Sequence, residues 1–386
     1  MMTRRVRRLR VAMLGPYPEN PQRIAGGVDA VVATLAGEMA AHRPEIDLHI
    51  LRCVADRRRP TIEQGNGLTL HWLPRRRWGR LTFHARDVAE LRRALAALRP
   101  DLVHAHGTGL YAGAAVSVPW PAVITVHGIV FREARLATGL KDRLGWELDA
   151  LYERWVLRQA RHLIAISPYV VREFSRWTRA KVHLIENPVA DAFFDLSSPG
   201  EPGRILFAGR LIPRKDPLTA IRAFAIFQAR CPGAQLRIAG ALDDSTCAAA
   251  AKALSAELGL AEKVHFLGHL SEAELLAEYR ACWALLLSSV QETAPIVIEQ
   301  ALAAGRPVVT TAAGGAGSLV EDGVTGFVVP IGDAAGLAKG LNRLFDNPDL
   351  YQQMATAARQ QATLRFKVSA VVAQTVELYY QLVYEH

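Results

Sequence analysis

The sequence predicts two α/β domains, each built on a doubly wound parallel sheet, and three observations carry this prediction. The chain has 386 residues, more than one ordinary α/β core accommodates. Short apolar segments alternate with longer amphipathic ones, which is typical of parallel strands joined by helices. A polar run rich in proline and glycine at 196–203 interrupts this alternation, which then restarts. We therefore expect domains at 1–190 and 191–365, followed by one helix at 366–386.

In the first half, short apolar segments predict strands, several of which end at glycine or histidine. Strands are expected at 9–14, 47–53, 68–73, 101–107, 123–126, 162–167 and 181–185, and helices at 28–41, 84–98 and 146–161. In doubly wound sheets, ligands bind outside the carboxyl ends of the strands. Gly15, Gly26, Gly27, His106 and His127 lie at such ends. We therefore expect these residues to border a ligand site.

In the second half, the same alternation returns. Strands are expected at 204–208, 235–239, 264–267, 285–287 and 308–310, and helices at 218–230, 245–257 and 271–282. Glu292 lies in the loop after one strand, and Pro295 fits the first turn of the next helix. Gly314 and Gly315 precede another helix start, and helix N-termini attract anions. We infer a sugar-nucleotide site around Glu292; the alternative is an ordinary strand-helix repeat.

The loop at 209–217 carries positive charge next to a strand end. Gly209 has no side chain, so a ligand can approach its backbone closely. Arg210 and Lys215 stand five residues apart in this loop and are expected to converge on one anion. Cations aimed at a departing diphosphate stabilise the charge that develops on it. The alternative is a pair of solvated loop cations without a ligand.

Composition indicates a soluble globular enzyme. Hydrophobic residues make up 50% of the chain and charged residues 22%. No apolar run reaches the roughly 18 residues of a membrane-spanning helix, and the run after the basic N-terminus is too short for a secretory signal. The four cysteines lack the spacing of zinc ligands or of a disulfide framework. We therefore expect a cytoplasmic protein.

Charge is distributed unevenly along the chain. Residues 1–190 hold 30 Lys and Arg against 17 Asp and Glu, a net charge of +13, whereas residues 191–386 carry −4. Basic clusters lie at 4–10, 57–59 and 75–77, and the aromatic residues beside the last two are Trp72, Trp78 and Phe83. An anionic membrane surface or a polyprenyl-phosphate lipid fits this pattern, which would place the protein peripherally at the inner face of the membrane. Plain solubility is the alternative, and no nucleic-acid recognition motif accompanies the charge.

Three histidines lie on or at the ends of two predicted strands. His104 and His106 alternate with apolar residues, so one of the two is expected to face the core or a helix, and a structural role is expected for His104. His127 ends its strand directly before Gly128, where a polar side chain is costly unless it is used. We therefore expect a ligand contact for His127.

Motifs in both halves of the chain carry a family resemblance. They are GRLIPRKDP at 209–217, ETAPIVIEQALAAGRPVV at 292–309, GGAGSLVEDGVTGFVVP at 314–330 and, in the first half, DLVHAHG, ITVHG, IAISPYV and VHLIENPV. Together they resemble the retaining glycosyltransferases of family four, and the resemblance covers essentially the whole chain. It implies the GT-B fold, in which two Rossmann-like domains face a cleft and the C-terminal helix crosses back to the N-terminal domain. It also implies a metal-independent hexosyltransferase.

The resemblance implies roles for particular residues. The C-terminal domain would bind the sugar nucleotide, and the N-terminal domain would bind the acceptor. Arg210 and Lys215 would hold the diphosphate, and Glu292 would contact the donor sugar. The segment that follows would position this sugar through Thr293, Ala294, Pro295 and Ile296. From the other domain, the diphosphate would be approached by Gly26 and Gly27, and the transferred sugar would be faced by His127.

Gln300 departs from the family pattern. The family has a second glutamate at this position, eight residues after the first, and that glutamate holds the ribose hydroxyls of the nucleotide. Glutamine offers a carbonyl acceptor and an amide donor, but no charge. Glu299 points about 100° away on a helix and does not substitute for it. We expect weaker or altered nucleotide binding, with function retained.

The implied reaction uses a nucleoside diphosphate sugar as donor and no cofactor. The acceptor would be a glycan, a lipid-linked sugar or a small molecule, in bacterial polysaccharide or glycolipid assembly. Glu292 would stabilise charge during front-face departure of the diphosphate, without acting as a base. No metal is expected, since no DxD motif is present and Asp243-Asp244 has no partner acid. Two alternatives stay open: a GT-B epimerase or phosphorylase, and a non-catalytic sugar-nucleotide-binding relative.

Overall fold

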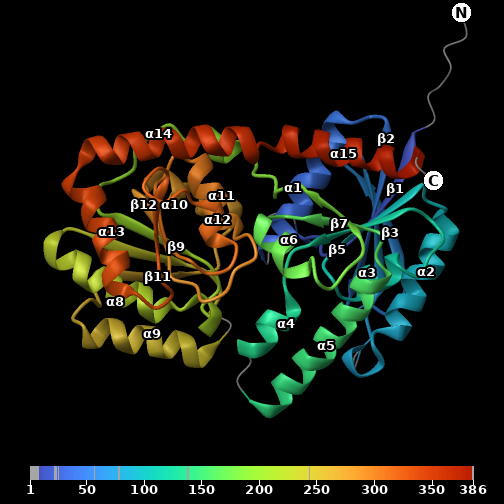
Figure 1. The fold of residues 1–386 in the computed structure, drawn as a ribbon, viewed down its shortest axis with the longest axis horizontal. Coiled ribbons are helices and arrows are strands. Elements are labelled where there is room, and N and C mark those ends of the chain that lie inside the picture. The colour runs from blue at the N-terminus through green and yellow to red at the C-terminus, as the bar shows by residue number, and fades with distance from the viewer. Residues whose placement is uncertain are drawn as a thin grey trace, which may run out of the picture. The chain divides into compact units, whose positions relative to one another are not determined.

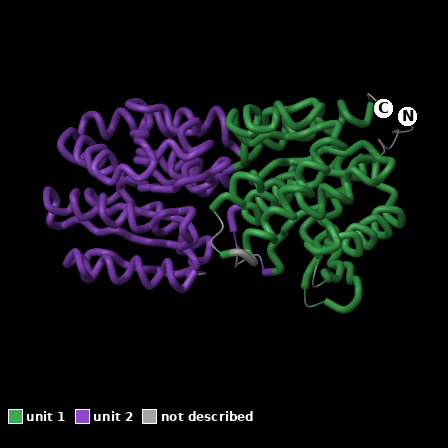
Figure 2. The backbone as a smooth tube through the Cα atoms, turned by 60° about the horizontal axis from the view of Figure 1, so that its bottom comes forward, with its two compact units in different colours: residues 1–19, 28–188, 368–386 green, residues 20–27, 189–367 purple. Residues whose placement is uncertain are grey.

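The chain forms two compact units in a computed structural model, which describes residues 8–20, 24, 26–55, 57–76, 79–136, 139–242 and 244–384. Unit 1 comprises residues 1–19, 28–188 and 368–386, and unit 2 comprises residues 20–27 and 189–367 (Figure 2). The segment 20–27 was expected in the first domain, but it groups with unit 2. Positions named above that lie outside the described residues are 4–7, Arg77, Trp78 and Asp243.

Unit 1 contains a sheet whose described strands follow the order β3-β4-β2-β1-β5-β6-β7-β8. The strands are β1 (Leu9–Leu14), β2 (Ile46–Val54), β3 (Thr61–Gly65), β4 (Leu68–Pro74), β5 (Leu102–His106), β6 (Ala122–Val126), β7 (His162–Ala165) and β8 (Lys181–Leu184). Neighbouring strands pair in parallel except β3, which is antiparallel to β4. The sequence did not predict β3, because all of its side chains are exposed and leave no apolar pattern.

Helices flank the sheet of unit 1 on both faces (Figure 1). They are α1 (Gly27–His42), α2 (Ala85–Leu98), α3 (Leu110–Ala115), α4 (Val130–Glu133), α5 (Leu140–Gln159), α6 (Pro168–Phe174) and α15 (Val368–Tyr384), with the 3₁₀ turns η1 (Gly79–Thr82) and η2 (Ala134–Leu136). Trp72 on β4 has 3% of its surface exposed, because neighbouring elements cover it. The expectation that Trp72 contacts a membrane is therefore wrong.

The C-terminal helix α15 belongs to unit 1 and completes its core. Val372, Val376 and Tyr379 are buried in the same apolar cluster as Val11 on β1. The Tyr379 hydroxyl also lies 2.6 Å from Nδ1 of His104, a hydrogen bond between residues far apart in sequence. The predicted return of the last helix to the N-terminal domain is thus seen directly in the packing.

Unit 2 contains a parallel sheet in the order β11-β10-β9-β12-β13-β14. Its strands are β9 (Arg204–Ala208), β10 (Gln235–Ala239), β11 (Val264–Gly268), β12 (Ala284–Leu287), β13 (Val308–Thr311) and β14 (Gly326–Val329). Its helices are α7 (Asp191–Phe194), α8 (Pro217–Arg230), α9 (Ser245–Glu257), α10 (Glu272–Ala281), α11 (Ile296–Ala303), α12 (Ala316–Leu319), α13 (Ala334–Asp346) and α14 (Pro348–Arg365), with the 3₁₀ turn η3 (Pro213–Lys215).

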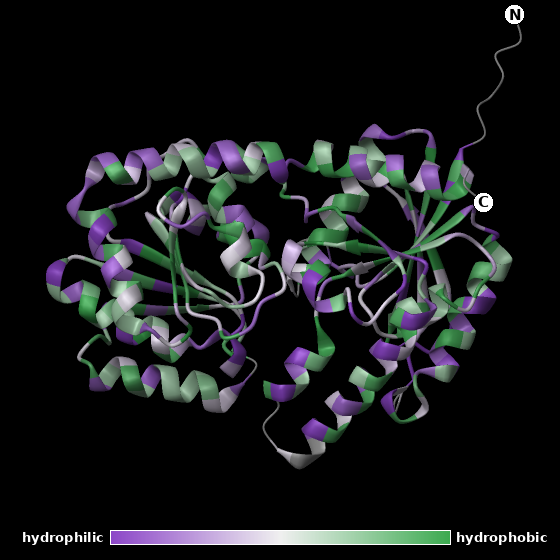
Figure 3. Cartoon of the chain, viewed as in Figure 1, coloured by the Kyte–Doolittle hydropathy of each residue, from purple (hydrophilic) through white to green (hydrophobic). Residues whose placement is uncertain are grey.

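Burial on both faces explains the composition of the central strands. Leu285, Leu286 and Leu287 are consecutive on β12, and none has exposed surface. A parallel sheet covered on both sides needs such continuous apolar runs instead of alternation. Figure 3 shows this contrast, with apolar strands inside each unit and mixed polar and apolar residues along the helices. The predicted fold class, two doubly wound α/β domains, is confirmed.

Both sheets contain a point where the strand order reverses. In unit 1 the chain builds outward from β1 in one direction and continues from β5 in the other, and in unit 2 the same happens at β9 and β12. Such switch points leave a crevice at the carboxyl ends of the two strands, where ligands of doubly wound proteins bind. The fold therefore marks the loops after β9 and β12, and those after β1 and β5, as the places to examine.

Candidate functional site

The switch point of unit 2 begins with a tightly packed backbone. Gly209, directly after β9, has a φ of 155° and its amide donates to the carbonyl of Ala239, 2.8 Å away. A side chain at Gly240 would meet the Gly209 oxygen at 1.9 Å. Glycine at position 240 is therefore required for the loops after β9 and β10 to approach each other.

The 3₁₀ turn η3 holds two cations toward the loop after β12. Asp216 ends the turn in a left-handed conformation with a φ of 46°, and its side chain caps α8. Ser288 Oγ donates to the carbonyl of Asp216 at 2.6 Å, and the amide of Val290 donates to the carbonyl of Arg214 at 2.9 Å. These bonds fix Arg214 and Lys215 against the loop that carries the predicted acid.

Glu292 lies at the centre of this arrangement, with 4% of its surface exposed. Lys215 Nζ lies 2.5 Å from its Oε1, and Arg214 Nη1 lies 3.3 Å from its Oε2. Ser289 Oγ also donates to Oε1, at 2.6 Å. The carboxylate is therefore bound by two cations and one hydroxyl, all within unit 2.

The electrostatics of Glu292 favour its ionised form. Burial alone would raise the pKa of this carboxyl, but the charges of Lys215 and Arg214 and the hydrogen bonds from Lys215 and Ser289 outweigh burial and lower the pKa. Two cations around one carboxylate leave an excess of positive charge at the strand ends. Such a cluster can accept a further anion without losing its own ion pairs, because an ammonium group has three donors.

A third loop joins the site from β13. The amide of Gly315 donates to the carbonyl of Glu292 at 2.9 Å, and Thr311 Oγ1 donates to the carbonyl of Ser289 at 2.5 Å. Gly314 has a φ of 52°, a conformation that favours glycine. The loops after β9, β12 and β13 are thus tied together at one edge of the sheet.

Gln300 lies on α11, one helix further along. It is buried, and its Oε1 accepts a hydrogen bond from the Tyr279 hydroxyl at 3.3 Å. The same hydroxyl donates to the carbonyl of Val297 at 2.9 Å. Glu299, its neighbour, has no exposed surface. Tyr279 was not predicted from the sequence, since it lies on α10 and only the packing of two helices brings it here.

The predicted site residues are not all gathered at Glu292. Lys215 is in contact with it, whereas Arg210 is exposed and the guanidinium at Glu292 belongs to Arg214. An anion-binding role for Arg210 therefore stays a prediction. Thr293 and Pro295 are buried and Ala294 and Ile296 half-buried, and Pro295 lies at the N-cap position directly before α11, without a capping hydrogen bond. In the segment that groups with unit 2, Gly26 is half-buried and Gly27 is exposed.

The switch point of unit 1 carries histidines. His106 Nδ1 lies 2.9 Å from His127 Nε2, and the ring centroids of His104 and His106 are 4.2 Å apart. His104 Nε2 lies 2.7 Å from Thr125 Oγ1. Residues two apart on a strand share a face, so both rings lie together and both residues are buried. The expected interior position of one of these two residues thus holds for both, His104 and His106.

The surroundings of these histidines favour the neutral form of the rings. Burial lowers the pKa of His104 to about 3 and that of His127 to about 4, and it lowers that of His106 well below the usual range. A hydrogen bond between two imidazoles needs one protonated and one bare nitrogen, which two neutral rings supply. A side chain at Gly15, after β1, would meet the Cβ of His106 at 3.0 Å, so the backbone closes over this ring.

Glu153 is a buried acid in unit 1 that the sequence did not single out. Its Oε1 accepts from Thr108 Oγ1 at 2.7 Å and from the amide of Val130 at 3.2 Å, and its Oε2 accepts from the amide of Phe131 at 3.2 Å. Burial raises the pKa of this carboxyl to about 7, against these hydrogen bonds. Glu153 thereby ties α5 to the loop that follows His127.

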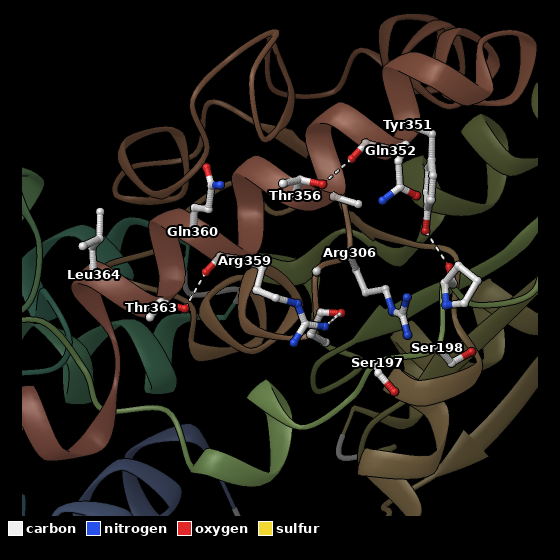
Figure 4. Close-up of a pocket in the computed structure, with 14 residues that line it drawn as sticks. Ser197, Ser198, Arg306, Tyr351, Gln352, Thr356, Arg359, Gln360, Thr363 and Leu364 are labelled. Carbon is white, nitrogen blue, oxygen red and sulfur yellow. Dashed lines mark hydrogen bonds between the residues drawn. The ribbon is translucent and has the colours of Figure 1, made fainter.

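A cavity of about 900 Å³ elsewhere in unit 2 contains none of these residues. It lies between α14 and the segment around Ser197 and Ser198 (Figure 4). Arg306 and Arg359 line it, but both guanidinium groups donate to backbone carbonyls, those of Tyr279 and Ala304 among them. The two guanidinium groups therefore satisfy carbonyl groups at the C-terminal ends of helices. Their presence in the lining of the cavity is explained by this structural role.

Within the described residues, no group of three or more His, Cys, Asp and Glu side chains is arranged to hold a metal ion. The helices that the structure describes include none with the length and apolar character needed to cross a bilayer.

Comparison with known families assigns both halves of the chain. Residues 189–361 match the model described as Glycosyl transferases group 1, and residues 25–193 match the model described as Glycosyltransferase Family 4. A glycogen synthase of Mycobacterium tuberculosis is 31% identical over 297 residues, which cover 73% of this chain and 69% of that protein. A D-inositol 3-phosphate glycosyltransferase of Streptomyces scabiei is 29% identical over 414 residues, which cover 98% and 92%.

Two solved structures with the same fold align with nearly the full length of this chain. Sucrose-phosphate synthase from Thermosynechococcus elongatus has a TM-score of 0.80 at 22% identity, covering 98% of this chain and 100% of that one. HepE from Anabaena, in complex with UDP-glucose, has a TM-score of 0.73 at 22% identity, covering 96% and 99%. At this identity the likeness concerns the fold.

Proposed function

We propose that this chain, which belongs to family 4 of the glycosyltransferases and is a glycosyltransferase of the GT-B fold, binds a nucleoside diphosphate sugar in unit 2. The ion-paired cluster of Lys215, Arg214 and Glu292 carries this proposal. The cluster lies at the switch point of the sheet and holds more positive than negative charge, and its carboxylate is buried while its two cations are half-buried. Family membership favours glycosyl transfer over the epimerase, the phosphorylase and the non-catalytic binding protein considered above.

The cluster supports a retaining mechanism without a protein nucleophile. Lys215 and Arg214 supply the positive charge that a departing diphosphate needs, and Arg210 is proposed to add to it from the same loop. Glu292 is held ionised, so it can accept hydrogen bonds from sugar hydroxyls and stabilise positive charge on the sugar ring. His127, which is neutral, is proposed to contact the donor sugar as a hydrogen-bonding group.

The relatives guide the choice of donor and acceptor. The HepE complex contains UDP-glucose, so uridine sugars are the first donors to test. The relatives by sequence include a glycogen synthase and an inositol phosphate glycosyltransferase, which supports a carbohydrate or polyol acceptor. The net charge of +13 on residues 1–190 supports a lipid-linked acceptor at an anionic membrane surface, in polysaccharide or glycolipid assembly.

A ligand screen tests this proposal. The melting temperature of the purified chain is measured with UDP-, GDP- and ADP-sugars, because a ligand of the native state raises it according to its affinity. One nucleotide class should raise the melting temperature of the native chain and of Lys339→Ala, an exposed lysine on α13, but not that of Lys215→Ala. Release of nucleoside diphosphate is then followed with the donor that binds. A response that is the same in Lys215→Ala would remove the donor site from this cluster.

A further inference from the structure

Unit 1 contains an apolar cavity that the donor site does not use. It has a volume of about 440 Å³ and lies between η1, the first turn of α2, α3 and α5, with Phe83, Ala85, Val88, Leu151 and Trp155 among its lining residues. The two aliphatic hydroxyl groups of its lining donate to backbone carbonyls: Ser117 Oγ donates to Gly113, and Thr82 Oγ1 donates to Gly79 at 3.2 Å. The cavity therefore offers hydrocarbon and aromatic surface to an occupant.

Three aromatic rings form one wall of this cavity. The rings of Phe83 and Tyr152 are stacked with centroids 5.9 Å apart, and those of Tyr152 and Trp155 with centroids 5.5 Å apart. Phe83 and Trp155 nevertheless expose 46% of their surface each, and Leu151 between them exposes 52%. The wall is thus built and ordered, yet open to water at its mouth.

The exposed apolar surface continues beyond the cavity. Leu144, two helical turns before Leu151 on the same side of α5, exposes 62% of its surface, and Leu81 in η1 exposes 64%. Contiguous exposed apolar patches on soluble proteins mark interaction sites. A helix that presents leucine and tryptophan on one face and charge on the other is suited to the surface of a bilayer.

The backbone at the mouth of the cavity is strained. Phe83 and His84 have φ values of 45° and 56°, so two successive residues with side chains adopt the left-handed conformation. The amide of His84 donates to the carbonyl of Gly79 at 2.7 Å, which holds this bend. Strain of this kind persists where the surroundings enforce it and is concentrated at functional sites. Here it holds Phe83 at the rim of the cavity.

The charge around the cavity selects the partner. Thr82, Phe83, Ala85 and Val88 line the cavity, and the sequence around them, 75–93, contains seven arginines against Asp87 and Glu90. One of these arginines, Arg80, is paired with Asp149 of α5 at 2.9 Å. Asp87 is buried and accepts the amide of Arg76 at 2.8 Å, so its charge is directed inward. Basic segments beside an apolar surface are attracted to anionic lipid headgroups.

We propose that this cavity takes a hydrocarbon chain of an anionic membrane lipid, while the rim formed by Leu81, Phe83, Leu144, Leu151 and Trp155 lies in the membrane interface. The binding of the lipid is argued from the cavity itself. Only the role of this lipid as the acceptor of the sugar rests on the proposed function. It identifies which surface of unit 1 meets the lipid. This surface is centred on η1 and α5, and not on Trp72, from which the sequence suggested membrane contact.

Vesicle flotation with the full chain tests the docking surface. Vesicles of phosphatidylglycerol and phosphatidylcholine should carry the native chain, and vesicles of phosphatidylcholine alone should carry at least tenfold less. Leu151→Asp should lower the bound fraction about tenfold, because it places a charge at the mouth. The matched control is Leu364→Asp, an exposed leucine of unit 2 with 82% of its surface accessible, which should bind like the native chain. Equal binding of both variants would overturn the docking surface.

Two further measurements test entry of the chain into the cavity. Phosphatidylglycerol with brominated acyl chains should quench part of the tryptophan fluorescence, and Trp155→Phe should remove that part. Ala85→Phe fills the cavity while keeping its rim apolar, so it should weaken vesicle binding about fivefold. Native binding by Ala85→Phe together with no quenching at Trp155 would mean surface adsorption only, which contradicts the proposal.

Donor binding separates this inference from the proposed function. The response of the melting temperature to the nucleotide sugar is measured on the same preparations, and Leu151→Asp should keep it. Donor binding without any vesicle binding would overturn this inference alone and leave the surface to a protein partner. Vesicle binding without any donor response would overturn the proposed function but not the lipid site.

Discussion

Unit 1 and unit 2 place polar side chains at the same point of the same kind of sheet, and the two sets differ in charge. In unit 2, Lys215 and Arg214 lie against Glu292, and the ion pairs keep this buried carboxylate ionised. In unit 1, His104, His106 and His127 contact one another, and burial keeps them neutral. The topology of the sheet thus determines where the polar side chains lie. Their neighbours, cations in unit 2 and other imidazoles in unit 1, determine whether these side chains are charged. A charged site suits a diphosphate, and a neutral one suits sugar hydroxyls.

The largest effect is expected from removing charge in unit 2. Lys215→Ala should lower turnover by about 10²–10³-fold, as loss of a single donor to a developing anion does. Release of nucleoside diphosphate under saturating donor measures it, with Lys339→Ala as the control. A rate within twofold of that of the native chain would show that Lys215 has no part in the chemistry, and would contradict the assignment of the charged cluster of unit 2 to the diphosphate.

Removal of the neutral imidazole of His127 in unit 1 should lower the activity less than removal of the charge of Lys215. His127→Ala should lower kcat/KM about tenfold, the value of one neutral hydrogen bond. The rate of the native chain should also be independent of the charge of His127 between pH 6 and 8, because its pKa is lowered to about 4. An acid limb near pH 6.5 that disappears in His127→Ala would show that this ring is charged during the reaction.

A negative charge introduced at Gln300 in unit 2 should increase the affinity for the donor. Gln300→Glu should tighten donor binding about fivefold, because a charged acceptor strengthens hydrogen bonds to hydroxyls. Calorimetric titration with the donor measures this, and Gln352→Glu, an exposed position on α14, is the control. An unchanged dissociation constant would mean that Gln300 does not contact the nucleotide.

The smallest effect concerns Glu153, the acid of unit 1 with a raised pKa. Burial raises the pKa of its carboxyl to about 7 in the folded chain, from an ordinary value of 4.5. Its contribution to stability is therefore present below about pH 4.5 and lost as the pH rises through 7. The histidines act in the opposite direction, because their lowered pKa values cost stability as the pH falls below about 6.5.

A matched variant isolates the Glu153 term. The melting temperature of the native chain minus that of Glu153→Gln should fall by about 5 °C between pH 5 and pH 8. The difference cancels the histidine contribution, which both chains share. A difference that rises with pH would show that Glu153 is ionised and stabilising, like Glu292 in unit 2.

Much of the fold followed from patterns in the sequence, and the reasons differ between elements. Strands β1, β9 and β10 occupy the predicted ranges, because their buried positions carry apolar residues that the sequence pattern registers. The edge strand β3 escaped prediction because it buries nothing. Helix α4, with four residues, is too short for helical periodicity to register.

The sequence indicated the position of a site residue where that position depends only on neighbouring residues in the chain, as in a loop directly after a strand. The positions of Glu292 and Lys215 in loops after strands could be inferred, but not the contact of Arg214 with Glu292. That contact depends on the 3₁₀ turn, which ends at Asp216 with a φ of 46°. The pairing of His106 with His127 depends on β5 lying beside β6, a neighbourhood that the linear order does not specify.

The C-terminal helix has a consequence for how the protein is made. Most of unit 1 precedes unit 2 in the chain but α15 follows it, so unit 1 lacks this helix until residues 189–367 of unit 2 have been translated. Domains usually fold as they emerge, starting from the N-terminus. In this chain the first unit to be translated is the last to be completed. Until then the nascent protein leaves open the place that Tyr379 will fill beside His104.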